Sequence, residues 1–146
     1  METTRAQNTA SDRNAATMRR FYSELFIGRR FELMPELVSP ELINHTAPAG
    51  HQHGFGPITS LIETLGTAFP DGSYDIEDVV TDGDVAVMRA WYQGTHLGDF
   101  FGHPATGTPF RFLQIHWMRF SDDGRVVEHW GLRDDATHLR QLGITG

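Results

Sequence analysis

Hydrophobic positions in the first half of the chain recur with the 3.6-residue period of helices. Near the start they form a one-sided apolar stripe, which predicts an amphipathic helix ending at Gly28 and carrying Met18, Phe21, Tyr22, Leu25 and Phe26. A second, short helix is predicted over Phe31–Leu37, because a residue that precedes proline, as in Ser39-Pro40, is disfavoured in a helix. A third helix is predicted over Pro57–Phe69, where proline occupies the favourable first turn.

From Ser73 onward the hydrophobic period shortens to two, the period of β-strands. Turn-forming residues at 81–84 and 121–124 separate the extended segments, which indicates about four antiparallel strands. A short C-terminal helix follows at Asp135–Leu142. Helices packed on a curved antiparallel sheet predict the α+β fold class, with residues 12–146 as a single domain. The small and polar residues 1–11 predict a mobile N-terminal tail.

The strand Phe110–Phe120 is the most informative segment. Its even positions place aromatic residues and Met118 around two polar residues, Gln114 and His116. Its odd positions are apolar in the middle of the strand and carry arginine near both ends, so neither face has the pattern of a face exposed to solvent. We therefore expect the even face to line a pocket. The odd face carries Leu113, Ile115 and Trp117, and we expect a second copy of the chain to cover it in a homodimer.

The amino-acid composition excludes several kinds of binding partner and catalytic site. A chain of 146 residues with 12 Lys+Arg against 19 Asp+Glu has one domain's length and a net charge of −7, so nucleic acid and anionic membranes are unfavourable partners. The chain has no cysteine, which excludes thiol nucleophiles and thiolate metal sites. No segment has the pattern of a signal peptide or a membrane span, so we expect a cytoplasmic protein.

Histidines and aromatic residues in loops suggest further roles. His51-Gln52-His53 lies on a glycine-rich loop without fixed geometry or a completing ligand, so we expect no metal site and no cofactor. Phe101 belongs to a loop that could act as a pocket lid or as a plug. Motifs for a serine nucleophile, a phosphate loop or a dinucleotide are absent.

Six segments together resemble the SnoaL-like polyketide cyclases, in an order and spacing that cover Arg19–Gly143. They are Glu41–His45, Gly56-Pro57, Gly94–Pro104, Gln114–Arg119, Gly124–Trp130 and Leu139–Gly143. The resemblance implies a cone-shaped α+β barrel of the nuclear-transport-factor-like superfamily, usually dimeric, with the architecture of ketosteroid isomerase, scytalone dehydratase and limonene epoxide hydrolase. It also implies cofactor-free intramolecular aldol condensation that uses a carboxylic acid.

The resemblance assigns a role to one histidine but finds no residue for the catalytic carboxylic acid. A family histidine matches His116, but Gly131 stands where the cyclases carry their catalytic Asp, and a fold alone does not transfer a reaction. The candidate catalytic residues are therefore His116, His129 and Asp134, although an Asp ahead of a helix is also a preferred cap. The candidate substrate-binding residues are Asn44, His45, Met88, Tyr92, Phe101, Phe112, Gln114 and Met118.

The position of His129 depends on the register of the last hairpin, for which two choices stay open. If Phe120 pairs with Arg125, His116 lies opposite His129. If Ser121 pairs with Arg125, through a type I turn and a bulge at Gly124, Trp130 faces His116 instead. Turn chemistry favours the second register. The resemblance favours the first, which we take as the prediction.

The function expected from these observations is cofactor-free acid–base catalysis on a hydrophobic carbonyl compound, such as intramolecular aldol cyclisation or isomerisation in secondary metabolism. One alternative is water addition by an epoxide-opening or hydratase-type enzyme. The other is a non-catalytic small-molecule binding protein that lost its chemistry with the Asp replaced by Gly131.

Overall fold

The structure is a computed structural model that describes the backbone of residues 2–144 and the side chains of residues 9–144. Its helical elements are α1 (Glu2–Arg20), the π-helix η1 (Phe21–Ile27), the 3₁₀ helix η2 (Phe31–Leu33), α2 (Met34–Leu37), α3 (Phe55–Ala68) and α4 (Asp135–Leu142). Its strands are β1 (Val38–Asn44), β2 (Ser73–Asp82), β3 (Val85–Thr95), β4 (Pro109–Phe120) and β5 (Val126–Arg133).

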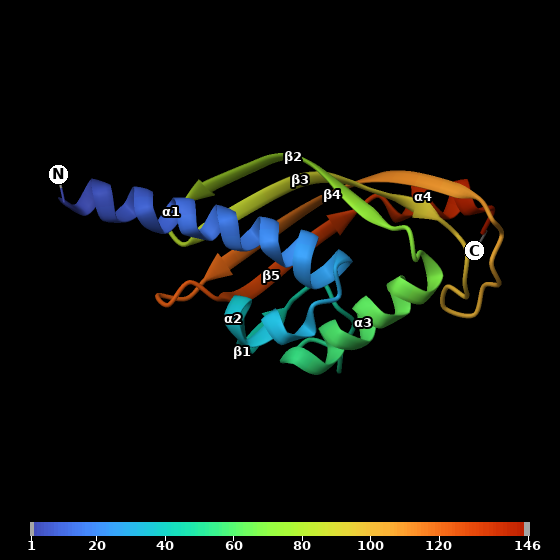
Figure 1. The fold of residues 1–146 in the computed structure, drawn as a ribbon, viewed down its shortest axis with the longest axis horizontal. Coiled ribbons are helices and arrows are strands. Elements are labelled where there is room, and N and C mark those ends of the chain that lie inside the picture. The colour runs from blue at the N-terminus through green and yellow to red at the C-terminus, as the bar shows by residue number, and fades with distance from the viewer. Residues whose placement is uncertain (1, 145–146) are drawn as a thin grey trace.

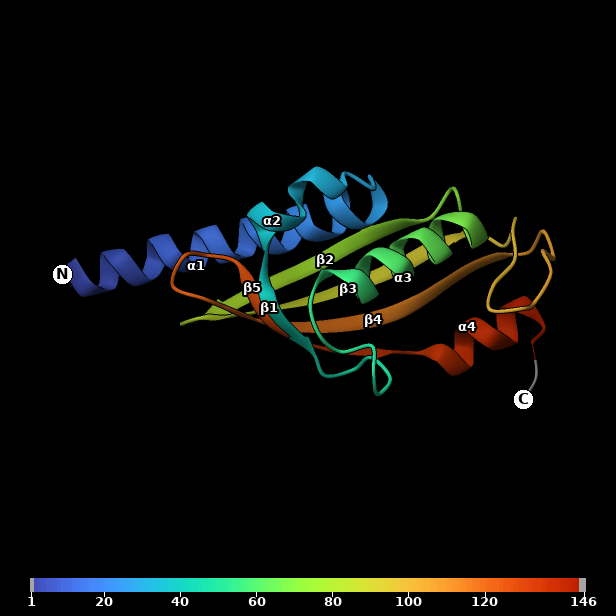
Figure 2. The same ribbon diagram turned by 90° about the horizontal axis from the view of Figure 1, so that it is seen from below.

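The strands form one curved sheet in the order β1-β5-β4-β3-β2. The helices α1, α2 and α3 lie on one face of this sheet, and α4 lies at its far end (Figures 1 and 2). The predicted α+β class and the short C-terminal helix are confirmed. The sheet has five strands instead of about four, because Val38–Asn44 adds an edge strand parallel to β5. That segment contains Pro40, which an edge strand tolerates but which hides the strand from pattern reading.

The predicted apolar stripe becomes the inner side of α1 and η1. Met18, Tyr22 and Leu25 are almost fully buried against the sheet. The helix ends as predicted at Gly28, whose N–H donates to the carbonyl of Ser23. At its other end α1 starts at Glu2, so part of the predicted tail is helical, and the mobility of that segment stays a prediction.

Two apolar clusters fill the space between helices and sheet. The larger one packs η1, α2 and α3 against the inner faces of β3 and β4. The smaller one lies at the other end of the sheet, where α4 closes the fold, and consists of Ala68, Phe69, Tyr92, Phe110, Phe112 and Leu142. The polar residues of the inner face therefore lie between two apolar ends.

The hairpin between β4 and β5 follows neither predicted register. Ser121 and Arg125 pair at the turn as in the second register, with Gly124 at φ 83°. A bulge then shifts the pairing by one residue between Arg119 and Phe120, so that His116 pairs with Gly131 and Met118 with His129. The prediction that His116 faces His129 directly is wrong by two residues. The inner-face assignment of His129 is nevertheless right, because two one-residue shifts restore the parity of a strand.

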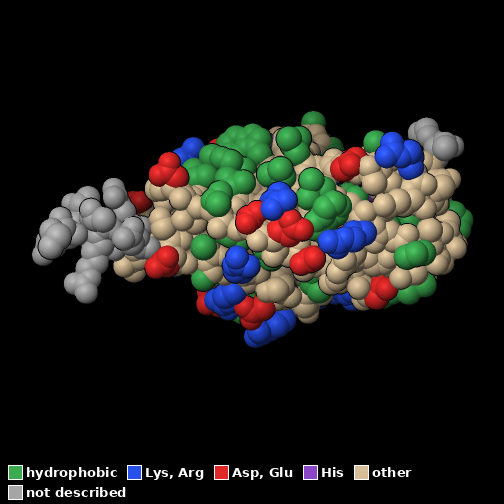
Figure 3. All heavy atoms as spheres, turned by 90° about the horizontal axis from the view of Figure 1, so that it is seen from above, with side chains coloured by type: hydrophobic (Ala, Val, Ile, Leu, Met, Phe, Trp, Pro, Cys, Tyr) green, Lys and Arg blue, Asp and Glu red, His purple; other side chains and the backbone are tan. Residues whose placement is uncertain are grey.

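The outer face of the sheet carries exposed apolar side chains. Ile115, Trp130 and Leu132 are 42%, 40% and 79% exposed, and they lie on the paired strands β4 and β5. Figure 3 shows hydrophobic side chains gathered along one side of this face, next to arginine and carboxylate side chains. Among residues 2–144 no helix is both long and apolar enough to cross a membrane.

Candidate active site

The inner face of β4 is built by simple alternation. All its even positions from 110 to 120 are buried, so the face predicted to line a pocket is the inner face of the sheet. Gln114 and His116 are only 3% and 5% exposed among aromatic and methionine side chains. Two polar groups at the centre of an apolar face must find hydrogen-bond partners there, because burying them unpaired is costly.

The partners come from three other strands and form a chain of short hydrogen bonds. His116 Nε2 lies 2.7 Å from Gln114 Oε1, and His116 Nδ1 lies 2.8 Å from His129 Nε2. His129 Nδ1 in turn lies 2.8 Å from Asn44 Oδ1. At the other end, the hydroxyl of Tyr74 donates to Gln114 Oε1 over 3.1 Å. The chain therefore runs from β2 through β4 and β5 to β1.

The hydrogen-bond partners leave the two histidine rings one proton short. Asn44 Oδ1 also accepts the N–H of Thr46, so it is an acceptor toward His129, whose Nδ1 must donate. A neutral His129 then has a lone pair on Nε2. Gln114 Oε1 requires a proton on His116 Nε2, which leaves a lone pair on His116 Nδ1. Two lone pairs 2.8 Å apart repel each other, so this arrangement needs one proton shared between the rings.

Burial favours the opposite charge state. It is the largest influence lowering the pKa of His116 well below its usual value, and His129 and Arg133 lower it further. Burial, followed by Arg133 and His45, lowers the pKa of His129 to about 4. The pair is therefore neutral at neutral pH. A neutral pair is compatible with the chain if the Gln114 amide rotates and donates N–H to His116 Nε2.

A change in the charge of the histidine pair would thus require the Gln114 amide to rotate. With the extra proton present, the Gln114 carbonyl oxygen accepts from two donors, Tyr74 O–H and His116 Nε2–H. Burial raises the pKa of the Tyr74 phenol well above its usual value, so this hydroxyl stays protonated. Two protonated donors that converge on one carbonyl oxygen in an apolar surrounding can also stabilise a developing enolate.

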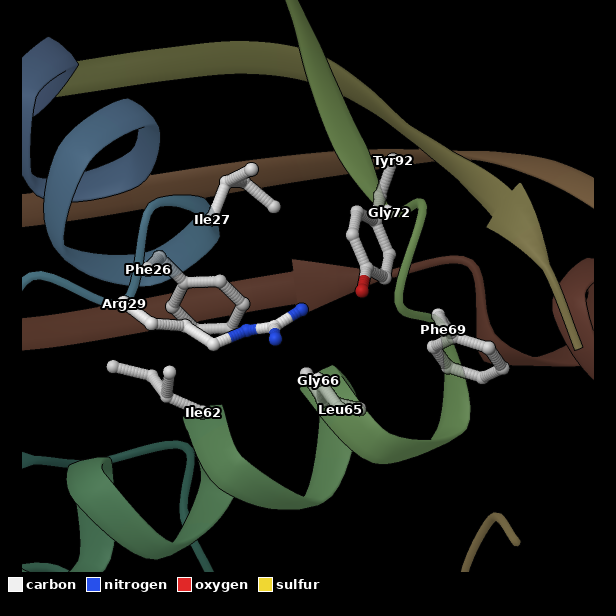
Figure 4. Close-up of a pocket in the computed structure, with 9 residues that line it drawn as sticks. All are labelled: Phe26, Ile27, Arg29, Ile62, Leu65, Gly66, Phe69, Gly72 and Tyr92. Carbon is white, nitrogen blue, oxygen red and sulfur yellow. The ribbon is translucent and has the colours of Figure 1, made fainter. Parts of the chain in front are cut away.

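Access to this site requires movement of aromatic side chains. Tyr22 covers His116 with ring centroids 4.8 Å apart, and Tyr74 lies between His116 and Tyr92. A small cavity lies on the far side of Tyr92, between η1 and α3 (Figure 4). Its volume of about 10 Å³ is enough for roughly one water molecule. A substrate therefore reaches His116 only when the tyrosines turn aside.

Three residues predicted for the site lie outside this inner region. Asp134 is exposed and caps α4 by accepting the backbone N–H of Thr137. His45 lies on the outside, stacked on Trp130 with ring centroids 3.9 Å apart. Phe101 is 66% exposed at the tip of its loop, with φ 45°. Asp134 therefore caps a helix and His45 packs on the outer face, and Phe101 does not reach the inner face.

The other predicted contact residues lie on the inner face. Met88 and Met118 are fully buried beside the histidine pair, in pairing positions with His116 and His129. Tyr92 stacks on Tyr74 with ring centroids 4.8 Å apart, farther along the same face. Phe112 lies deeper in the smaller cluster.

The structure brings inside three residues that the sequence did not place there: Tyr74 and His138, which were not considered, and His96, which was weighed only as a loop metal ligand. Tyr74 alternates correctly for the inner face of β2, and that alternation could have identified it. His96 and His138 are buried in the smaller cluster, where His138 stacks on Phe112 with ring centroids 4.2 Å apart. Neither Nε2 atom has a hydrogen-bond partner. Across the described part of the chain, no group of three or more His, Asp or Glu side chains could hold a metal ion.

Comparisons with known proteins agree on one family. The family model for the SnoaL-like polyketide cyclases matches residues 16–142. IdmH of Streptomyces antibioticus, a candidate polyketide cyclase, is 32% identical with a TM-score of 0.76, over 90% of this chain and 99% of that one. A candidate polyketide cyclase of Bacillus cereus is 27% identical with a TM-score of 0.74, over 89% and 80%. TsrD of Streptomyces laurentii is 25% identical with a TM-score of 0.80, over 89% and 94%. A search of curated proteins gave no match.

Proposed function

The chain belongs to the SnoaL-like polyketide cyclase family, and we propose that it is a cofactor-free acid–base enzyme acting on a hydrophobic carbonyl compound. The reaction is an intramolecular aldol cyclisation or an isomerisation, and its place is in secondary metabolism. One observation carries the proposal. Tyr74 O–H and the ring nitrogen His116 Nε2 both lie within hydrogen-bond distance of one carbonyl oxygen, that of Gln114, at 3.1 and 2.7 Å inside a buried apolar face.

In this proposal the substrate carbonyl replaces the Gln114 carbonyl. The neutral His116 accepts a proton from the carbon next to the substrate carbonyl, so a C–H bond breaks and an N–H bond forms. The electron pair moves to the substrate oxygen, which Tyr74 O–H stabilises. His129 shares the charge through the 2.8 Å contact, and Asn44 holds the His129 ring in the required tautomer.

The second half of the reaction returns the proton. The enolate carbon attacks a second carbonyl of the same substrate and forms the C–C bond. The oxygen of that carbonyl takes the proton back from His116, and the pair is neutral again. In isomerisation the proton returns to a different carbon instead.

The pKa of His116 indicates whether proton removal or enolate stabilisation contributes more to the rate. A histidine whose pKa lies well below neutrality is a weak base, so proton removal by itself is unfavourable. Donors prearranged at the enolate oxygen contribute roughly 10²–10³-fold each. Enolate stabilisation by Tyr74 therefore has to compensate for the weak base, and the apolar surroundings strengthen it.

Proton exchange on a model ketone tests the proposal without knowledge of the natural substrate. In D₂O the wild-type protein is expected to accelerate loss of the α-protons of 2-tetralone, followed by NMR. His116→Asn should lower the catalysed rate by at least ~10²-fold with little change in ketone affinity, because proton transfer acts in the transition state. His51→Asn makes the same substitution in an exposed loop and should keep the rate. Equal rates for the wild type and His116→Asn would refute the proposal.

The second candidate function is binding without catalysis. It is favoured by Gly131, which leaves the inner face without the acid that the family resemblance implies, and by the fact that both ring nitrogens of His116 already have partners. Such a protein would bind 2-tetralone and leave its α-protons in place, which the same experiment detects.

We also propose a second copy of the chain as the partner of the outer face. Ile115 pairs with Leu132, and Trp117 with Trp130, so the apolar side chains there are contiguous across two strands. An exposed apolar patch that continues across strands is typical of a subunit interface.

A further inference from the structure

The small cavity between η1 and α3 combines apolar walls with two polar groups that lack partners. Its walls include Phe26, Ile62, Leu65 and Phe69. The side chains of Arg29 and Tyr92 point toward the same space from opposite sides (Figure 4). Neither the guanidinium of Arg29 nor the hydroxyl of Tyr92 has a hydrogen bond or an ion pair within the described residues.

Among the described arginines, Arg29 and Arg19 have neither an ion pair nor a side-chain hydrogen bond, whereas most of the others form ion pairs. The neighbouring Arg30 pairs with Glu24 and Glu32, each at 3.0 Å. Arg20 and Arg89 likewise form ion pairs. Arg29 is an exposed residue whose guanidinium lines the cavity, so it is free to pair with a ligand of opposite charge.

The backbone and the opposite helix both accommodate this position of Arg29. Arg29 has φ 53°, in the left-handed region that residues with side chains rarely adopt. On α3 it meets Gly66, where a Cβ atom would lie 2.6 Å from Arg29 Nε. A side chain at position 66 would require the flexible guanidinium of Arg29 to shift. A sparsely populated backbone conformation at a pocket is a feature that functional sites share.

Tyr92 supplies the second donor. It is 3% exposed, and burial raises the pKa of its phenol, an effect that the charge of Arg29 partly offsets. The hydroxyl is therefore protonated and can donate a hydrogen bond into the cavity. A planar guanidinium and a hydroxyl facing each other match the two oxygens of a carboxylate.

We propose that Arg29 and Tyr92 bind the carboxylate of the substrate, which is therefore a hydrophobic carbonyl compound with an acid group. Tyr92 stacks on Tyr74, and Phe26 contacts Tyr74 with ring centroids 5.7 Å apart. Because the cavity holds roughly one water, the carbon skeleton of an anchored acid has to displace the rings of Phe26 and Tyr74 to extend toward His116. The carbonyl part of this assignment rests on the proposed function, whereas the carboxylate part does not.

The test compares a carboxylate with its uncharged amide on the full-length protein. Dissociation constants of 4-phenylbutanoate and 4-phenylbutanamide are measured by NMR chemical-shift titration at pH 7.5 in 50 mM and 500 mM NaCl. The wild type should bind the carboxylate at least ~10-fold more tightly at low salt, as expected for charge-assisted hydrogen bonds, and the preference should shrink at high salt.

Variants assign this preference to the two residues. Arg29→Gln should remove the preference and leave amide affinity unchanged, and Tyr92→Phe should reduce it. Arg30→Gln removes a neighbouring, already paired arginine and should keep it. The proposal is overturned if the wild type binds both probes equally or binds neither up to 10 mM, or if Arg29→Gln and Arg30→Gln behave alike. A thermal melt of each variant confirms folding.

The same titration separates this proposal from the catalytic one. His116→Asn should retain the carboxylate preference, because His116 lies beyond Tyr74. Loss of α-proton exchange with a retained preference would remove the catalytic role of His116 only. Normal exchange with equal affinities would remove the carboxylate site only.

Discussion

Adding one methyl group at Gly131 is expected to disrupt the histidine pair. A Cβ atom built on Gly131 would lie 2.8 Å from His116 Nδ1 and 3.3 Å from His129 Cε1. Neither ring can move aside freely, because Gln114 and Asn44 hold their outer nitrogens. Gly131→Ala must therefore break the 2.8 Å contact between the rings or displace the strand.

The expected cost of Gly131→Ala follows from two contributions. Overpacking a filled interior costs about 1–3 kcal/mol, and losing a buried hydrogen bond costs about 0.5–1.5 kcal/mol. The lower backbone entropy of alanine in the unfolded chain offsets a few tenths of this. We expect the free energy of unfolding to fall by about 1–4 kcal/mol, a large part of the ~5–15 kcal/mol of a typical domain.

A double-mutant cycle in urea, followed by circular dichroism, tests this reasoning. With His129→Ala in the background, the His116 ring can move into the space that is freed, and Gly131→Ala should cost less than about 1 kcal/mol. An unfolding free energy of Gly131→Ala within ~0.5 kcal/mol of the wild type, or an equal cost in both backgrounds, would refute the proposed packing. Gly131→Asp should be destabilising for the same steric reason, although its side chain would point to the inner face.

Three further outcomes are expected. His129 and His138 have folded pKa values of about 4, below the ordinary 6.5, so their contribution is complete above pH 6.5 and is lost as pH falls through 4. Urea unfolding should therefore show a decrease of a few kcal/mol between pH 7.5 and 4.5, and a constant stability would contradict the burial argument. Trp117→Glu should shift a sedimentation profile from dimer to monomer while Leu97→Glu, in a loop, does not; a monomeric wild type would remove the interface. Prolonged chelation should leave 2-tetralone exchange unchanged, and a loss restored by one divalent ion would overturn metal-independent chemistry.

Much of the fold and part of the site could be predicted from local pattern alone. Alternation along Phe110–Phe120 places Gln114 and His116 on the buried face, because side-chain direction in a strand depends only on the parity of the position. The apolar stripe that ends at Gly28 and the helix that starts near Pro57 depend on contacts within a few residues. Such features are determined before the chain acquires long-range contacts.

Tertiary structure alone decided which groups meet. The bulge near Phe120 set the partner of His116, and its effect depends on how β5 fits between β1 and β4. Asn44 reaches His129 only because β1 adds to the sheet edge in parallel, a pairing between residues 85 positions apart. The proton count of the histidine pair, and the meeting of Arg29 with Tyr92, likewise combine distant segments. No local pattern encodes such distances, because they follow from how whole elements pack against one another.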